Sequence, residues 1–204
     1  GSGKTTCLKL MRDLYHPTKL ELSLDGTVIP NGFEGIAQAV TLIPQDPEIF
    51  ASTIEMNCTL GAEYTLDEIQ QCMDLAGFTE VLKKLPKGIQ SSTKEKGVSL
   101  SGGQKQRLAL ARGLLACKDK QIVLLDEQTS NLDKETESLV YRNIFKKFTG
   151  QTIIVSLHGI HLLPLFDRVI MFHDGKVIAD GTLDELLDSS EEFRHLWSKQ
   201  YHKE

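Results

Sequence analysis

The fold is decided by residues 99–133, which read SLSGGQKQRLALARGLLACKDKQIVLLDEQTSNLD. Ser101 and Gln104 form a Ser-x-x-Gln pattern, which predicts a capped helix start. Two consecutive glycines, Gly102 and Gly103, weaken a helix unless its backbone must approach another group closely. A helix N-terminus with free amides and a serine hydroxyl is suited to bind an anion. The pattern therefore indicates an anion site as well as a helix start.

A buried strand follows this helix and ends in two acids. Residues 122–125 are the apolar run IVLL, typical of a strand covered on both faces in a parallel sheet. Asp126 and Glu127 then fall at its carboxyl end, where open α/β sheets bind ligands. One acid there can hold Mg2+, and the second can orient or deprotonate an attacking water. The alternative interpretation is a solvated acidic turn, with Thr129 or Ser130 capping the next helix.

The chain begins with a second phosphate-binding pattern. Its first six residues, GSGKTT, match the end of the loop G-x-x-x-x-G-K-[ST], whose first glycine would lie three residues before Gly1. We therefore expect an N-terminal truncation within this loop. Backbone amides of such a loop surround phosphates, Lys4 would place its charge on the outer phosphates, and Thr5 would place its hydroxyl on Mg2+. The alternative is a cloning scar, Gly-Ser-Gly, ahead of a helix cap.

Composition and charge indicate one ordinary globular unit. The 204 residues are 40% hydrophobic and 25% charged, with a formal net charge of -5, so no basic excess suggests a nucleic-acid surface. No apolar run approaches the ~20 residues that a membrane-spanning helix needs, and no signal-peptide pattern stands at the start. The cysteines are widely spaced without a C-x-x-C pair, which indicates reduced thiols rather than disulfides or a zinc site.

Periodicity predicts the remaining elements. Helices are expected from helical spacing at 4–14, in amphipathic segments within 65–86, after Asp133, and at 182–187 and 191–201. Apolar strands are expected at 39–43 and 152–157. Hairpins that turn at Asp-Gly pairs are expected within 20–29 and 169–179.

The order and spacing of these motifs resemble the nucleotide-binding domain of ATP-binding cassette (ABC) proteins. The resemblance is carried by LSGGQ at 100–104, LLDE at 124–127 and SNLD at 130–133, and it covers essentially the whole chain. It implies an α/β fold with a P-loop NTPase core and a mainly parallel sheet, a small antiparallel β-subdomain and an inserted α-helical subdomain.

The resemblance also implies a domain organisation. Residues 1–204 would form a single ABC nucleotide-binding domain. Within it, 1–44 and 105–204 would make the P-loop core with part of the β-subdomain, and 45–104 the glutamine loop (Q-loop), the helical subdomain and the signature loop.

Individual residues receive roles from the same resemblance. The residues expected to bind nucleotide are Gly1, Ser2, Gly3, Lys4, Thr5 and Thr6, and the catalytic residues are Glu127, His158 and Gln45. The expected Mg2+ ligands are Thr5, Gln45 and Asp126. The residues that would contact ATP across a dimer are Leu100, Ser101, Gly102, Gly103 and Gln104, and the D-loop comprises Ser130, Asn131, Leu132 and Asp133. His158 is followed by Gly159 where the family usually has arginine, and Gln128 stands where proline is usual. His161 and His173 do not align with the family's histidine.

Cofactors and partners follow from this resemblance. It implies ATP and Mg2+, and a second ABC nucleotide-binding domain, in a homo- or heterodimer, that pairs head to tail around two ATP molecules. A transmembrane domain, fused upstream, would be the other partner and would hold the domain at the cytoplasmic face of a membrane. No nucleic acid is expected. The truncated chain alone is expected to be monomeric, to bind ATP poorly and to be a weak or inactive ATPase.

The favoured function is the motor domain of a membrane exporter. The words FASTI at 50–54, Glu95 in its TKEKG loop and the C-terminal tail resemble the exporter branch, although Lys94 replaces a glycine of that loop. Two alternatives stay open: the ATPase subunit of an importer, and a non-transport ABC ATPase acting on ribosomes or DNA. The sequence does not name the transported substrate, because that choice lies in the membrane domain.

Overall fold

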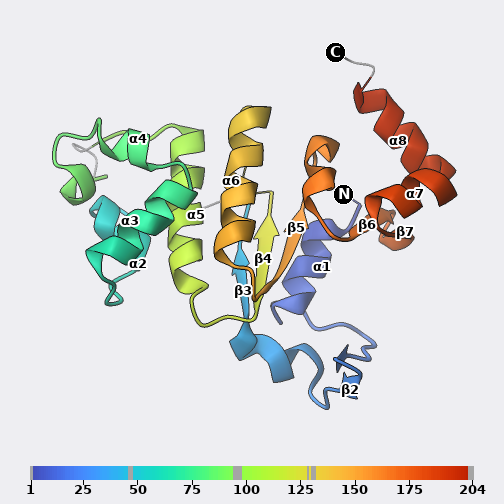
Figure 1. The fold of residues 1–204 in the computed structure, drawn as a ribbon. Coiled ribbons are helices and arrows are strands. Elements are labelled where there is room, and N and C mark those ends of the chain that lie inside the picture. Colours follow the sequence, from blue (N-terminus) through green and yellow to red (C-terminus); the bar gives the residue numbers. More distant parts are fainter. Residues whose placement is uncertain (1, 46–47, 94–97, 128, 130–131, 202–204) are drawn as a thin grey trace.

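A three-stranded parallel sheet forms the centre of the protein (Figure 1). The computed structural model describes residues 2–45, 48–93, 98–127, 129 and 132–201. The strands are β3 (Val40–Ile43), β4 (Ile122–Asp126) and β5 (Thr152–Ser156), in the order β3-β4-β5. The register places Ile43 beside Leu125, and Leu125 beside Val155. Because the strands are parallel, the residues that follow each of them gather at one edge of the sheet.

Helices cover both faces of this sheet. Val40 and Leu124 pack against Leu8 of α1 (Lys4–Met11), whereas Ile43 and Leu125 belong to the main core with α5 (Gly102–Ala116) and α6 (Lys134–Lys147). Successive side chains of a strand point to opposite faces, so α1 lies on one face and α5 and α6 on the other. Figure 1 shows α6 in front of the sheet. Cover on both faces explains the continuous apolar run of β4.

Two antiparallel hairpins lie outside the central sheet. They pair β1 (Ser23–Leu24) with β2 (Thr27–Val28), and β6 (Val169–His173) with β7 (Lys176–Gly181). Both turn at Asp-Gly pairs in which each residue has positive φ: 49° and 78° at Asp25 and Gly26, and 45° and 74° at Asp174 and Gly175. Positive φ at both central residues is what a tight two-residue hairpin turn requires. Both predicted hairpins are confirmed.

The remaining helices lie around this framework. They are α2 (Ile54–Thr59), α3 (Leu66–Leu75), α4 (Thr79–Leu82), α7 (Leu183–Ser189) and α8 (Glu191–Tyr201), with the 3-10 helices η1 (Gly32–Ala39), η2 (Gly88–Gln90) and η3 (Ile160–Leu165). Helices α2 and α3 pack on α5. The expected fold class, a mixed α/β fold with a parallel sheet and small antiparallel strands, is confirmed. Among the described helices, none has the length and apolar character to cross a bilayer.

Three details differ from the sequence-based expectation. Helix α1 ends at Met11 rather than continuing to Leu14, because Asp13 takes a left-handed φ of 62°. The cap of α6 is Asp133, whose carboxylate accepts from the Thr136 N–H, whereas the buried Thr129 hydroxyl donates to the Glu137 side chain instead. Ser130 lies outside the described residues. The short helices α2, η1, η2 and η3 were not predicted, because too few residues define their period.

A glycine brings α5 close to β3. A Cβ atom on Gly113 would lie 2.3 Å from Cδ1 and 2.4 Å from Cγ1 of Ile43, far closer than carbon atoms pack. Ile43 is the last residue of β3, and Gln45 follows two residues later. The close approach therefore sets the distance between α5, which begins at the signature motif, and the strand that leads to Gln45.

We predict that Gly113→Ala destabilises the protein, although alanine favours a helix over glycine by about 1 kcal/mol. Overpacking against Ile43 typically costs about 1–3 kcal/mol, so the midpoint of unfolding should shift to a lower urea concentration. In an Ile43→Ala background, where the clashing atoms are gone, the same substitution should be neutral or stabilising. An unchanged or raised midpoint for Gly113→Ala alone would contradict the close approach.

Candidate functional site

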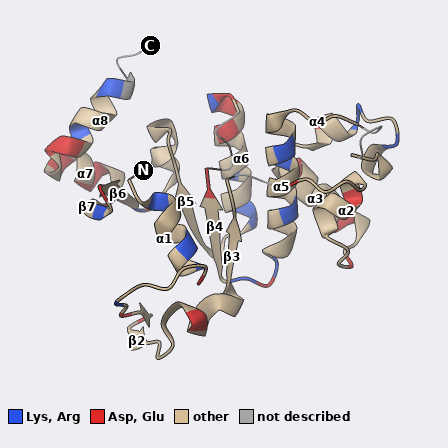
Figure 2. Ribbon diagram, turned by 180° about the vertical axis from the view of Figure 1, so that it is seen from behind, with Lys and Arg blue, Asp and Glu red and all other residues tan. Residues whose placement is uncertain are grey.

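Polar side chains gather at the carboxyl edge of the parallel sheet. Gln45 follows β3, Asp126 ends β4 with Glu127 directly after it, and His158 follows β5. The sequence separates Gln45 from Glu127 by 82 residues, and only parallel pairing brings them into contact. In Figure 2 the basic start of α1 and the acidic end of β4 lie toward the same end of the strands. The edge therefore combines carboxylates, an amide, an imidazole and a lysine.

Glu127 lies at the centre of this group. Its Oε2 accepts a hydrogen bond from Gln45 Nε2 at 2.8 Å, and its Oε1 lies 2.6 Å from His158 Nε2. Its side chain is only 8% exposed. The backbone has a left-handed φ of 49°, and its N–H donates to the Ser156 carbonyl at 3.3 Å. Such strain in a non-glycine residue costs on the order of 1–3 kcal/mol and is concentrated at functional sites.

Asp126 connects β4 with the start of α1. Its Oδ1 accepts hydrogen bonds from Thr5 Oγ1 at 3.0 Å and from Ser156 Oγ at 2.6 Å. Asp126 and Ser156 are both buried. The first turn of α1 is therefore fixed to the carboxyl end of β4, so the amides of this turn and the acid face the same region.

The segment before α1 has a shape suited to phosphate. Gly3 is the N-cap with φ of 102°, and a Cβ atom there would lie 3.3 Å from Gly175 Cα in the β6–β7 turn. Gly175 N–H donates to the Ser2 carbonyl at 3.0 Å. Lys4 Nζ lies 3.4 Å from Ser2 Oγ, so the ammonium stays near the loop. Thr6 is exposed in the same turn, and Gly1 lies outside the described residues.

The signature segment begins α5 with the predicted capping box. Ser101 N–H donates to Gln104 Oε1 at 2.9 Å, and Gln104 N–H donates to Ser101 Oγ at 3.3 Å. Leu100 is buried in the main core, whereas Ser101 and Gly102 are exposed. Among the described residues, no atom lies within 4 Å of the place that a Cβ atom on Gly102 would take. Packing within this chain therefore does not require a glycine there.

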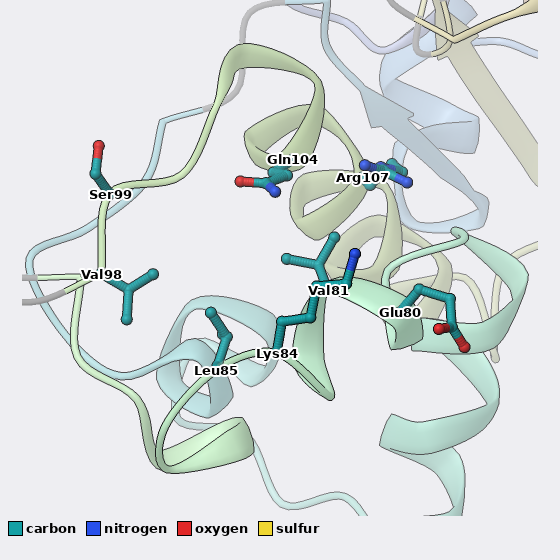
Figure 3. A pocket seen from close by; sticks show the side chains of 8 residues that line it. All are labelled: Glu80, Val81, Lys84, Leu85, Val98, Ser99, Gln104 and Arg107. Atoms are coloured by element: carbon teal, nitrogen blue, oxygen red, sulfur yellow. The ribbon is translucent and has the colours of Figure 1, made fainter.

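A hollow of about 250 Å³ lies behind this helix start (Figure 3). It is lined by Glu80, Val81, Lys84, Leu85, Val98, Ser99, Gln104 and Arg107. Arg107 closes one side, because its Nη1 donates to the Gly77 carbonyl at 3.0 Å and its Nε to the Gly103 carbonyl at 3.4 Å. None of the lining residues belongs to the group around Glu127. The hollow is thus separate from the carboxyl edge of the sheet.

The candidate residues form two groups within the chain. The residues around Glu127 and the start of α1 meet directly, but α1 and α5 pack on opposite faces of the sheet. The signature segment therefore does not complete the group around Glu127. Of the D-loop, Leu132 packs against the main core, and Asp133 caps α6. The backbone N–H and hydroxyl of Thr136 donate to the Asp133 carboxylate and lower its pKa.

Some candidates lie outside the described residues. They are Gly1, Lys94, Glu95, Gln128, Ser130 and Asn131.

The oxygen atoms near Asp126 are suitable ligands for Mg2+. Thr5 Oγ1 and Asp126 Oδ1 are oxygen atoms 3.0 Å apart. Mg2+ prefers oxygen ligands, and it commonly takes one or two from the protein while waters and phosphates supply the others. Gln45 directs its Nε2 at Glu127, so its other amide atom, the oxygen, is the one suited to a metal ion.

Two buried hydroxyls of the site were not predicted. Ser156 donates to Asp126, and Thr129 donates to Glu137 and lies 3.3 Å from Tyr141 Oη. The signal for Ser156 was a hydroxyl at the end of the apolar strand TIIVS, close before His158. Thr129 had no comparable signal, because its partners lie on the next helix.

Comparison with known proteins gives consistent matches. The family model described as ABC transporter matches residues 1–130. ABC transporter B family member 21 of Arabidopsis thaliana is 36% identical over 193 residues, which cover 94% of this chain and 15% of that protein. ABC transporter B family member 3 of Dictyostelium discoideum is 37% identical, over 100% of this chain and 14% of that protein. The chain thus spans about a seventh of the length of these relatives.

A solved structure is also similar. It is titled "Structure of a bacterial Atm1-family ABC exporter with ATP bound". The TM-score is 0.85 and the sequence identity 28%, over 98% of this chain and 35% of that chain.

We predict that Ser156→Ala destabilises the protein by about 1–3 kcal/mol, because the buried Asp126 carboxylate loses a donor. The free energy of unfolding in urea measures this loss. Ser189→Ala is the matched control, since its hydroxyl bonds an exposed helix carbonyl, and it should change stability by less than about 0.5 kcal/mol. Equal effects of the two substitutions would show that Ser156 does not support Asp126.

Proposed function

Because this chain belongs to the ABC transporter family, we propose that it is the ATP-binding and ATP-hydrolysing motor domain of a membrane exporter. The relatives and the similar structure, whose title names an ABC exporter with ATP bound, favour this function over an importer subunit or a non-transport ATPase. The relatives are several times longer than this chain. We therefore propose that it acts within a longer protein, whose transmembrane domain holds it at the cytoplasmic face of a membrane.

One observation carries the proposal of hydrolysis. The Glu127 carboxylate is held between Gln45 and His158, beside the Asp126 that bonds the first turn of α1. ATP phosphates would lie at the start of α1, where backbone amides, the helix dipole and Lys4 favour negative charge. A carboxylate fixed beside that position can accept a proton from a water that attacks the terminal phosphate.

Each residue then has a defined task. Glu127 orients the attacking water and takes its proton, and Lys4 stabilises the charge on the outer phosphates. His158 and Gln45 fix the two oxygens of the Glu127 carboxylate. Mg2+, held by Thr5 and Asp126, would offset the negative charge of the phosphates. The products are ADP and inorganic phosphate.

A complete site needs a second domain of the same kind. The start of α1 and the start of α5 pack on opposite faces of the sheet, and Gly102 has open space around it. Both features support a head-to-tail pair in which Ser101 and Gly103 of one domain contact the ATP held by the other. The D-loop, residues 130–133, would lie at the same interface. ATP drives closure only through its higher affinity for the closed pair.

We predict that Glu127→Gln in the full-length protein lowers the rate of ATP hydrolysis by about 100-fold or more, because the amide cannot take a proton. ATP binding, measured with a fluorescent analogue, should be retained. Glu192→Gln, at an exposed position of α8, is the matched control and should hydrolyse ATP at the wild-type rate. Wild-type turnover in Glu127→Gln would remove Glu127 from the role of base.

We predict that Lys4→Ala weakens ATP binding by roughly 10- to 100-fold, the effect of losing a hydrogen bond to a charged group worth about 1.5–3 kcal/mol. Titration with the same fluorescent analogue measures the dissociation constant. Lys9→Ala is the control, since Lys9 lies in the last turn of the same helix, near Tyr15. Equal affinities of Lys4→Ala and wild type would exclude Lys4 from the phosphates.

A further inference from the structure

The loops that carry Glu127 and His158 are joined a second time, behind the carboxyl edge of the sheet. His161, in the first turn of η3, has its Nε2 3.1 Å from Glu137 Oε2 on α6, an ion-pair contact that lacks the geometry of a hydrogen bond. The other oxygen of the same carboxylate, Glu137 Oε1, accepts a hydrogen bond from Thr129 Oγ1. Thr129 follows Glu127 by two residues, and His161 follows His158 by three. Glu137 therefore connects the two loops.

These groups are well shielded from water. Thr129 is 2% exposed, the Glu137 side chain 13% and the His161 side chain 23%. Tyr141, fully buried on the next turn of α6, lies under the Thr129 hydroxyl. Removing a partner from a shielded carboxylate is costly, so Glu137 holds both loops to α6.

Gly159 makes room for this connection. A Cβ atom on Gly159 would lie 2.8 Å from both Cε1 and Nδ1 of His161. The imidazole ring of His161 thus covers the backbone of the residue that directly follows His158. A side chain at position 159 therefore competes for the space of the imidazole ring, and the ring would have to shift to accommodate it.

Together with the chain segments between them, these contacts form a closed path. It runs from the Glu127 carboxylate to His158, along the chain to His161, across to Glu137, to Thr129 and back along the chain to Glu127. We propose that His161, with Gly159 as the space for its ring, is a positioning residue that holds His158 against Glu127 for ATP hydrolysis. The proposal rests on the proposed function. His161 acts through Glu137 and the chain segment that carries His158, and we assign it no direct part in the reaction.

Steady-state ATP hydrolysis by the full-length protein tests this role. His161→Ala should lower kcat about 5- to 10-fold and leave the KM for ATP within about twofold, because Lys4 and the phosphate loop are untouched. His161→Gln should recover at least half of the wild-type kcat, since its side-chain amide nitrogen can reach the place of the imidazole Nε2. His161→Leu fills similar space without a polar nitrogen, so it should lose as much kcat as His161→Ala, whereas a residue that only fills space would be replaced by leucine without this loss.

A double-mutant cycle with Gly159 tests the shared space. Gly159→Ala should lower kcat as much as His161→Ala does, and the double variant should lose no more than either single variant. Gly150→Ala is the matched control, because no described atom lies within 4 Å of the place of its Cβ atom. It should leave kcat unchanged.

The outcomes separate the two proposals. Absence of hydrolysis by the wild-type protein would overturn the proposed function itself. Hydrolysis by the wild-type protein with unchanged kcat in His161→Ala would overturn the positioning role alone. Equal losses in His161→Ala and His161→Gln, or additive losses in the Gly159 cycle, would also overturn it.

Discussion

Parallel pairing of β3, β4 and β5 is the constraint on which the candidate site depends. Parallel strands deliver the residues that follow them to a single edge, and here these residues are Gln45, Glu127 and His158. A shift of one residue in the register would turn every side chain of a strand to the opposite face. The tight packing of Ile43 in β3 against Gly113 of α5 opposes such a shift. Burial of the sheet thereby fixes the geometry of the polar edge.

The position of Glu127 combines strain with restraint. A left-handed backbone at a glutamate costs on the order of 1–3 kcal/mol, and the observed φ of 49° is accompanied by contacts that offset this cost. The backbone N–H bonds Ser156, and both carboxylate oxygens have partners. The left-handed backbone turns the Glu127 carboxylate away from the direction of β4 and places it between the loops that follow β3 and β5. The same conformation would be unfavourable without partners on both sides.

The two faces of the sheet carry different parts of the candidate site. Helix α1 brings its first turn to Asp126 on one face, and α5 exposes the signature segment on the other, with Gly113 packed tightly against Ile43. Under the proposed function, a domain built in this way would hold one set of contacts to ATP directly and offer the second set to a neighbouring domain. Pairing of two domains then becomes part of the proposed catalytic cycle, because neither phosphate site is complete alone.

Local patterns in the sequence predicted most of the longer helices and strands and the candidate motif residues. Capping boxes, apolar runs and Asp-Gly turns depend on residues within a few positions of each other, so the start of α5, strand β4 and both hairpins could be predicted. How distant segments meet depends on the fold as a whole. The Thr5–Asp126 and Ser156–Asp126 hydrogen bonds, the Gly113–Ile43 contact and the link from His161 to Glu137 depend on strand register and helix placement. These are set by packing of the whole core, which no local pattern records.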